Sequence, residues 1–292
     1  MARLFSEEFV RAIERLRIVT RQTPRGGRHA EHRSADLGSG MEFRDFRAYV
    51  PGDDVRRLDW NLYRRSGRLF LRLFEQPEDL PVAILLDVSD SMFFEAPPRA
   101  DAARLATAIL AAVALQQHDR VTLQPFGADL LPPLSVNTGR AGLRRVLTYL
   151  ERLGPAGPTN VVRAATRFAA RRQRPGLAAV VSDFFDPAGA VGVTEALGHL
   201  RHRLALVQVI RSSDAEPALN GELRLLDCES GGAVDVSITR ESVGRYRQAY
   251  AAFTDELSRF AARRQAVHAR IDADRPILDQ LDELFAGGVL VT

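Results

Sequence analysis

The chain has 292 residues, of which 46% are hydrophobic and 26% are charged, values typical of a globular protein. These values exclude a disordered or low-complexity chain. All 40 basic residues are arginine, which excludes mechanisms that need a lysine, such as Schiff-base chemistry or P-loop phosphate binding. The single cysteine, Cys228, excludes an intrachain disulfide, and no apolar run approaches the roughly 18 residues that a membrane helix needs. We therefore expect a cytoplasmic protein with no segment inserted in a membrane.

Residues 1–37 are predicted to form a basic helix and loop. Residues 1–33 carry eight arginines against four glutamates, an excess of four positive charges in a chain whose net charge is +3. Apolar residues at helical spacing predict an amphipathic helix over residues 6–20, with Ser6 as its N-cap. The apolar face of this helix consists of Phe9, Ile13, Leu16 and Val19 or Thr20. An arginine-rich arm can bind nucleic acid, but this one lacks interleaved aromatic residues, so we favour a solvated helix face.

Residues 38–79 are predicted to form a small β-containing unit. The segment mixes aromatic and charged residues around a Pro-Gly-Asp-Asp turn, and residues 68–75 have the pattern of a strand. Its Arg47–Trp60 motif has two interpretations. Its charges form an ion-pair network that fixes the turn, with Trp60 and Tyr49 packed beneath it, or they form a partner-binding patch. The residues assigned to that patch are Asp53, Asp54, Arg56 and Asp59.

From residue 80 onward, short apolar runs alternate with helical stretches. Near-continuous apolar character predicts parallel strands, covered on both faces, at residues 82–87, 121–126, 178–182 and 204–210. The predicted intervening helices are residues 101–117, 140–152 and 161–172. This alternation predicts an α/β fold, a doubly wound, mainly parallel sheet of the Rossmann type, preceded by the smaller N-terminal unit.

Shorter elements complete this prediction. An edge strand is expected at residues 129–134, and a hairpin at residues 223–227 and 233–238 around a Gly-Gly pair. We assign the doubly wound sheet to residues 80–240. Residues 241–292 are predicted to form helices that pack on the rest, at residues 241–265 and 276–285.

Polar side chains follow two of the predicted strands. The pattern Asp-x-Ser-x-Ser begins at the end of the first strand, and an aspartate follows the strand at 178–182. A threonine precedes the helix predicted at 161–172. Ligands of open α/β sheets bind beyond the carboxyl ends of the strands, where the winding reverses, so we expect these residues to face one crevice. The candidate metal ligands are Asp87, Ser89, Ser91, Thr159 and Asp183.

The chemistry of this set indicates a hard cation. Two carboxylates and three hydroxyls suit Mg²⁺, with Mn²⁺ or Ca²⁺ as alternatives, and match zinc or copper poorly. Neutral hydroxyls leave the ion able to accept one more anionic oxygen, such as an acidic side chain of another protein. We therefore expect a docking site rather than a catalytic centre. The plainer interpretation is a strand that ends in a serine-rich turn with an aspartate cap.

This arrangement resembles the metal-ion-dependent adhesion site of the von Willebrand factor A domain, and all five positions of that motif are present. Upstream, residues 38–43 and the Arg47–Trp60 motif, followed by Arg64 or Arg65 before a strand, resemble the bacterial domain-of-unknown-function family 58. In that family they directly precede a von Willebrand A-like region. The resemblance implies a protein partner, a MoxR-type AAA+ ATPase with its client, and a chaperone-like role in assembly or maturation. Many members carry membrane helices upstream, which we do not expect here.

We therefore expect a non-enzymatic, divalent-metal-dependent protein-interaction module. Two alternatives stay open, a metal-dependent hydrolase or phosphatase that uses the same aspartates, and a nucleic-acid binder that uses the arginine-rich arm. A phosphatase of the haloacid-dehalogenase type needs a second aspartate two residues after the first, together with a lysine. Ser89 holds that position after Asp87, and the chain has no lysine, so the sequence disfavours this enzyme class.

Overall fold

A computed structural model describes residues 4–16, 42–75, 81–137, 139–229 and 231–285. The chain divides into two compact units. The large unit comprises residues 1–22 and 80–292, and the small unit comprises residues 23–79. The helix predicted at the N-terminus thus belongs to the large unit, together with the segment after residue 240. No helix within the described ranges combines the length and the apolar character needed to cross a membrane.

The large unit is built around a six-stranded sheet, in the order β10-β7-β6-β3-β4-β5. Its strands are β3 (Pro81–Asp87), β4 (Arg120–Phe126), β5 (Leu134–Val136), β6 (Leu177–Ser182), β7 (Arg203–Ile210) and β10 (Val267–Asp272). All neighbours pair in parallel except β4 and β5, which are antiparallel. The central strands are buried along nearly their whole length, as strands covered on both faces must be. The predicted doubly wound, mainly parallel sheet is confirmed.

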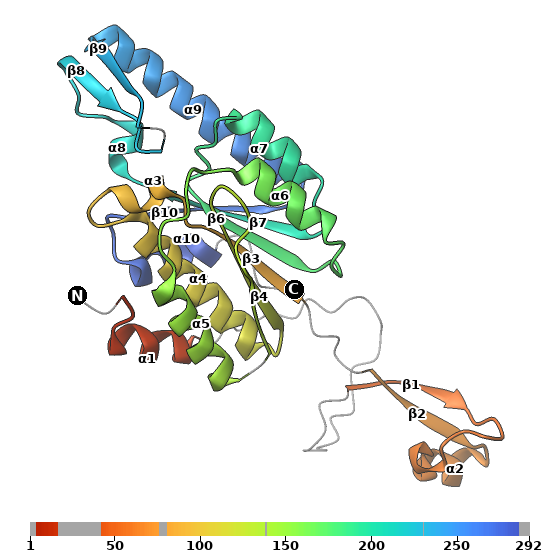
Figure 1. The fold of residues 1–292 in the computed structure, drawn as a ribbon. Coiled ribbons are helices and arrows are strands. Elements are labelled where there is room, and N and C mark those ends of the chain that lie inside the picture. Colours follow the sequence, from red (N-terminus) through yellow and green to blue (C-terminus); the bar gives the residue numbers. More distant parts are fainter. Residues whose placement is uncertain (1–3, 17–41, 76–80, 138, 230, 286–292) are drawn as a thin grey trace. The chain divides into compact units, whose positions relative to one another are not determined.

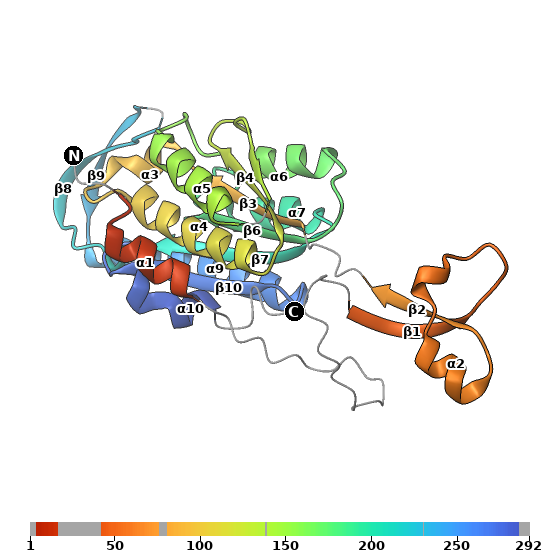
Figure 2. The same cartoon turned by 90° about the horizontal axis from the view of Figure 1, so that it is seen from below.

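Helices cover both faces of this sheet, and Figures 1 and 2 show the resulting three layers. One face is covered by α4 (Arg99–Gln116), α5 (Arg140–Arg152), the short 3-10 turn η2 (Ile277–Gln280) and α10 (Leu281–Phe285), and α1 (Glu7–Arg15) packs against α4. The other face packs against α6 (Val161–Ala170), α7 (Gly189–Gly198) and α9 (Arg240–Arg263). Helix α4 is buried on nearly all sides. Its many alanines favour the helical conformation, and their small side chains let neighbouring elements pack closely around it.

Helix α1 begins as predicted and docks on α4. The side chain of Ser6 accepts a hydrogen bond from Phe9 N at 3.1 Å, which caps the helix. Phe9 and Ile13 are buried in the core of the large unit, and Gln116 of α4 donates to Ile13 O at 3.0 Å. The helix ends at Arg15, earlier than predicted. Leu16 is its C-cap, and residues 17–20 of the predicted helix, with the loop that follows, lie outside the described residues.

Two strands differ from the prediction. Strand β10 was missed, because it lies at the sheet edge and alternates buried residues with exposed or half-buried polar ones instead of forming a continuous apolar run. The other edge strand, β5, begins at Leu134 and not at residue 129. Pro132 and Pro133 have no N–H to donate, so regular pairing with β4 begins only after them.

Three short elements follow strands of the main sheet. Helix α3 (Asp90–Phe94) follows β3, and helix α8 (Ser212–Ala215) follows β7. The predicted hairpin is present as β8 (Gly221–Leu226) paired antiparallel with β9 (Ala233–Ile238). These two strands form a separate sheet, and β9 leads directly into α9.

The small unit is an antiparallel pair of strands with two short helical segments. Strand β1 (Glu42–Ala48) pairs with β2 (Phe70–Glu75), and η1 (Val55–Arg57) and α2 (Trp60–Ser66) lie between them in sequence. The prediction that Trp60 packs beneath the motif is wrong, because its side chain is 59% exposed. It is the first residue of α2, whose residues are all exposed or half-buried, and its ring lies edge-on to Tyr63. Tyr49 is half-buried.

Candidate functional site

The candidate site lies where the winding of the sheet reverses. After β3 the chain continues to β4 on one side, and it later returns to β6 on the other side of β3. The loops that leave β3 and β6 therefore diverge, and this divergence creates the usual ligand position of open α/β sheets. Asp87 is the last residue of β3, and Asp183 directly follows β6.

Asp87 is fully buried, and both of its carboxylate oxygens are held. Oδ1 accepts a hydrogen bond from Ser89 N at 2.9 Å, and Oδ2 accepts one from Ser182 Oγ at 2.6 Å. Ser182 is the last residue of β6, so the bond joins the ends of the two strands that flank the reversal. These contacts fix the direction of the carboxylate without neutralising its charge.

The three hydroxyls predicted as ligands lie in one row. Ser89 Oγ lies 3.0 Å from Ser91 Oγ, which lies 3.2 Å from Thr159 Oγ1. Asp90 holds the two loops together, since its backbone N donates to Gly157 O at 2.9 Å and its Oδ1 accepts from Gly157 N at 3.0 Å. Asp90 is thus a positioning residue that the sequence analysis did not assign.

Asp183 is 3% exposed, and it is linked to the other candidate ligands through the charge of Asp87. Its Oδ1 accepts a hydrogen bond from Phe185 N at 3.0 Å. Burial, together with the neighbouring charge of Asp87, raises the pKa of Asp183 to about 7, and the Arg99 charge partly opposes this rise. Burial also raises the pKa of Asp87 to about 6, with a smaller contribution from the charge of Glu229. Two aspartates are thus buried near the ends of β3 and β6, and the charge of Asp87 acts on Asp183.

This donor set fits a hard divalent cation. Its two carboxylates balance the charge of such an ion, and its hydroxyls supply neutral oxygens. Nowhere in the described ranges do three His, Cys, Asp or Glu side chains form a metal-ligating group, so a zinc-type cluster is not seen there. The residues that would hold a cation here are Asp87, Ser89, Ser91, Thr159 and Asp183, and the ion would offset the repulsion of the aspartates.

Glu229 is a second residue that the sequence analysis missed. It lies in the turn between β8 and β9, and its Oε1 accepts hydrogen bonds from Thr159 N at 3.0 Å and Thr159 Oγ1 at 2.7 Å. These residues are 70 positions apart in the chain. No short sequence pattern predicts this contact, because it depends on how the β8–β9 hairpin folds relative to the site.

The predicted partner-binding residues lie in the small unit, where the carboxylates hold the backbone of the turn. Asp53 pairs with Arg47 at 2.6 Å and accepts from Val50 N at 2.9 Å, and these two bonds, that of Val50 first, lower the pKa of the Asp53 carboxyl. Asp54 caps η1, and Asp59, which is 7% exposed, caps α2. The remaining predicted residue, Arg56, is exposed.

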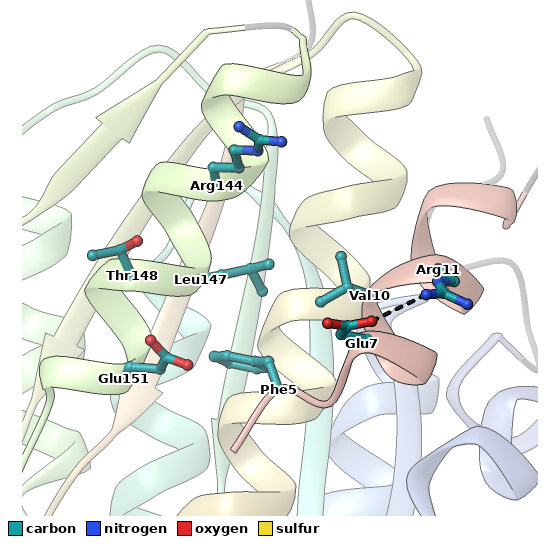
Figure 3. A pocket seen from close by; sticks show the side chains of 8 residues that line it. All are labelled: Phe5, Glu7, Val10, Arg11, Arg144, Leu147, Thr148 and Glu151. Carbon is teal, nitrogen blue, oxygen red and sulfur yellow. Dashed lines mark hydrogen bonds and ion pairs between the residues drawn. The ribbon is translucent and has the colours of Figure 1, made fainter. Parts of the chain in front are cut away.

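A groove between α1 and α5 lies elsewhere on the large unit (Figure 3). Its lining residues are Phe5, Glu7, Val10, Arg11, Arg144, Leu147, Thr148 and Glu151. Its charged residues are exposed, and Glu7 and Arg11 among them form an ion pair at 3.0 Å. The groove therefore gathers no buried polar chemistry comparable to the site at β3 and β6.

The fold and the site define an α/β protein with a candidate cation site at the switch point of a doubly wound sheet. The family model described as "Protein of unknown function DUF58" matches residues 45–258, and the chain belongs to this family. The family resemblance predicted from the sequence is thereby confirmed. Similar proteins include Uncharacterized protein Mb1516 of Mycobacterium bovis and Uncharacterized protein Rv1480 of Mycobacterium tuberculosis. Each is 26% identical over 253 residues, which cover 85% of this chain and 80% of the relative.

Similar solved structures include the conserved hypothetical protein BatB from Bacteroides thetaiotaomicron, with 17% identity and a TM-score of 0.43 over 71% of this chain and 98% of that one. An aerotolerance-related membrane protein from Bacteroides fragilis also has 17% identity and a TM-score of 0.43, over 71% and 99% of the two chains. A von Willebrand factor type A structure from Catenulispora acidiphila has 12% identity and a TM-score of 0.41, over 75% and 43%.

Proposed function

We propose that this protein is a metal-dependent protein-interaction module. Asp87, Ser89, Ser91, Thr159 and Asp183 hold Mg²⁺, or Mn²⁺ or Ca²⁺ in its place, and an acidic side chain of a partner protein docks there. The partner is a MoxR-type AAA+ ATPase or its client, as the family resemblance implies. The observation that carries this proposal is the meeting of two buried, mutually repelling carboxylates with a row of three hydroxyls at the switch point of the sheet.

The surroundings of the site favour docking over catalysis. Both oxygens of Asp87 accept hydrogen bonds from residues that hold it in place, so it is poorly placed to act as a nucleophile. Asp183 is likewise held by a backbone N–H. The chain contains no lysine, and its one cysteine is exposed in the hairpin turn. Apart from Asp87 and Asp183 themselves, these features supply no nucleophile or proton carrier for turnover.

A thermal unfolding experiment tests the metal site. A ligand that binds only the folded state stabilises it by about 2.7 kcal/mol when present at one hundred times its Kd. For a chain of this size we expect Mg²⁺ to raise the Tm by roughly 5 °C or more. The rise should disappear in Asp87→Ala and persist in Asp101→Ala, whose carboxylate pairs with Arg104 on α4. An equal rise in Asp87→Ala would place the ion elsewhere.

A pull-down tests the partner. The MoxR-type ATPase should be retained by the wild type in Mg²⁺ and lost with a chelator, with Asp87→Ala, or with Thr159→Ala. If the ATPase is retained with the chelator and by both variants, the metal-bridged model is wrong, and the Asp53–Asp59 segment becomes the candidate binding surface. Hydrolysis of a phosphate ester with Mg²⁺, lost in Asp87→Ala, would instead establish the hydrolase alternative.

A further inference from the structure

The hairpin that reaches the site is weakly anchored. Its strands β8 and β9 pair with each other and not with the main sheet. Most of their residues are exposed, and the side chains of Leu226 and Val234 are 68% and 62% exposed. A two-stranded hairpin is marginally stable by itself. Contacts made by its turn therefore help to hold it over the site.

Glu229 makes that contact. Its neighbours Asp227 and Cys228 are exposed, whereas Glu229 is half-buried. Its carboxylate accepts from both the backbone N–H and the hydroxyl of Thr159, and hydrogen bonds to an ionised acceptor are stronger than neutral ones. Thr159 lies just before Asn160, the N-cap of α6, and a helix N-terminus favours negative charge. The turn is itself shaped by Asp227, whose Oδ1 accepts from Glu229 N at 2.9 Å.

The contact involves a group that the proposed docking site needs. Thr159 is one of the five candidate ligands, and its hydroxyl here donates a hydrogen bond to Glu229. Glu229 is also close enough for its charge to act on Asp87. The Glu229 carboxylate, which belongs to the chain itself, therefore lies next to the site and contacts it at Thr159.

We propose that Glu229 is an internal competitor at the docking site. Held by Thr159, its carboxylate lies where an acidic side chain of a partner approaches the ion, so the β8–β9 hairpin must move aside before the partner binds. This inference rests on the proposed function in that both use the same site. A tethered group competes at an effective concentration on the order of millimolar. Removal of Glu229 therefore increases the affinity of the site for a free carboxylate.

Acetate is the simplest probe of this competition. It is titrated into the full chain in Mg²⁺, and the shift of the Thr159 amide resonance is followed by NMR. The variants are Glu229→Ala, Glu229→Gln and Glu222→Ala, the last removing an exposed acid from the same hairpin. The remaining resonances report whether each variant folds as the wild type does. We expect half-saturation at an acetate concentration at least tenfold lower in both Glu229 variants than in the wild type, with Glu222→Ala unchanged.

The inference would be overturned if half-saturation came at the same acetate concentration in all four proteins. It would also be overturned if acetate shifted the Thr159 amide resonance in none of them. An equal gain in Glu222→Ala and Glu229→Ala would also overturn it, because the effect would then be one of overall charge. Calorimetric titration of Mg²⁺ into the wild type and Asp87→Ala is run alongside. Absence of Mg²⁺ binding to the wild type defeats the proposed function, whereas Mg²⁺ binding combined with any of the three failing acetate results defeats this inference alone.

Discussion

Asp87 and Asp183 each contribute a fall in the stability of the metal-free protein as the pH rises. Their pKa values are raised to about 6 and about 7, against 3.8 for an unperturbed aspartate. The folded chain therefore binds more protons than the unfolded chain between these values. The stability supported by the protonated forms is fully present below about pH 4, and it is lost as the pH rises through the two raised pKa values.

We expect the free energy of unfolding of the metal-free protein to fall by a few kcal/mol between pH 4 and pH 8 through these two groups. In the variant with Asp87→Asn and Asp183→Asn this contribution should vanish, so its stability at pH 8 should exceed that of the wild type. Urea unfolding in a chelator at a series of pH values measures both. Parallel pH profiles for the two proteins would show that the aspartates carry no such penalty. Mg²⁺ at pH 8 should restore stability to the wild type alone.

Arg99 and Asp214 form a buried ion pair between α4 and α8, near the same end of the sheet. Two hydrogen bonds of 2.7 and 2.6 Å join them, and each side chain is 8% exposed. Glu95 adds a contact to Arg99 at 2.8 Å. The pair thereby connects the first turn of α4 to the segment after β7.

Removal of Asp214 leaves the Arg99 guanidinium buried with only part of its compensation. Breaking a buried pair costs about 3–5 kcal/mol, and because Glu95 remains we expect Asp214→Ala to lose about 3 kcal/mol. Asp101→Ala on the same helix breaks a partly exposed pair and should lose at most about 1 kcal/mol. Urea unfolding of the three proteins gives the comparison, and equal losses would mean that burial of Arg99 carries no special penalty.

At the scale of elements, substitutions in the small unit can show whether the charged residues of the Arg47–Trp60 motif stabilise its fold or bind a partner. Asp59 Oδ1 accepts from Asn61 N and Leu62 N, both at 2.9 Å, and so caps α2. Asp59→Ala should destabilise this helix by about 1 kcal/mol, seen as faster hydrogen exchange across α2. Arg56→Ala, which alters an exposed side chain, should leave exchange unchanged. If Arg56→Ala instead weakens ATPase binding while α2 stays protected, the motif is a partner surface.

The central strands were predictable because their burial on both faces gives an unbroken apolar run, as in residues 82–86. The location of the five candidate ligands beyond the carboxyl ends of the strands was predictable for a related reason, since the ends of such strands fix where the following polar residues lie. Their binding of a metal stays a prediction. Strand β10 was missed because edge position replaces that run with alternation. The Glu229 contact was missed because it is set by the fold of a hairpin far along the chain, and no spacing in the sequence encodes it.

At the scale of the whole molecule, the large unit draws its core from both ends of the chain. Phe9 and Ile13 of α1 share one hydrophobic cluster with Ile271 of β10, Ile277 of η2 and Leu284 of α10. The segment after residue 240 therefore completes the sheet and its covering layer. Residues 23–79 form a separate compact unit, inserted in sequence between α1 and β3.

This division predicts that the large unit folds without the small one. A chain in which residues 23–79 are replaced by about 20 Gly and Ser residues, which span at most about 70 Å when extended, keeps all elements of the large unit. We expect cooperative thermal unfolding and an Mg²⁺ affinity within about threefold of the full chain, because every candidate ligand comes from the large unit. A shortened chain that does not unfold cooperatively, or that does not bind Mg²⁺, would show that the site requires the small unit. If the shortened chain binds Mg²⁺ but loses the ATPase, the partner also recognises residues 23–79, and the metal site is one of two contacts.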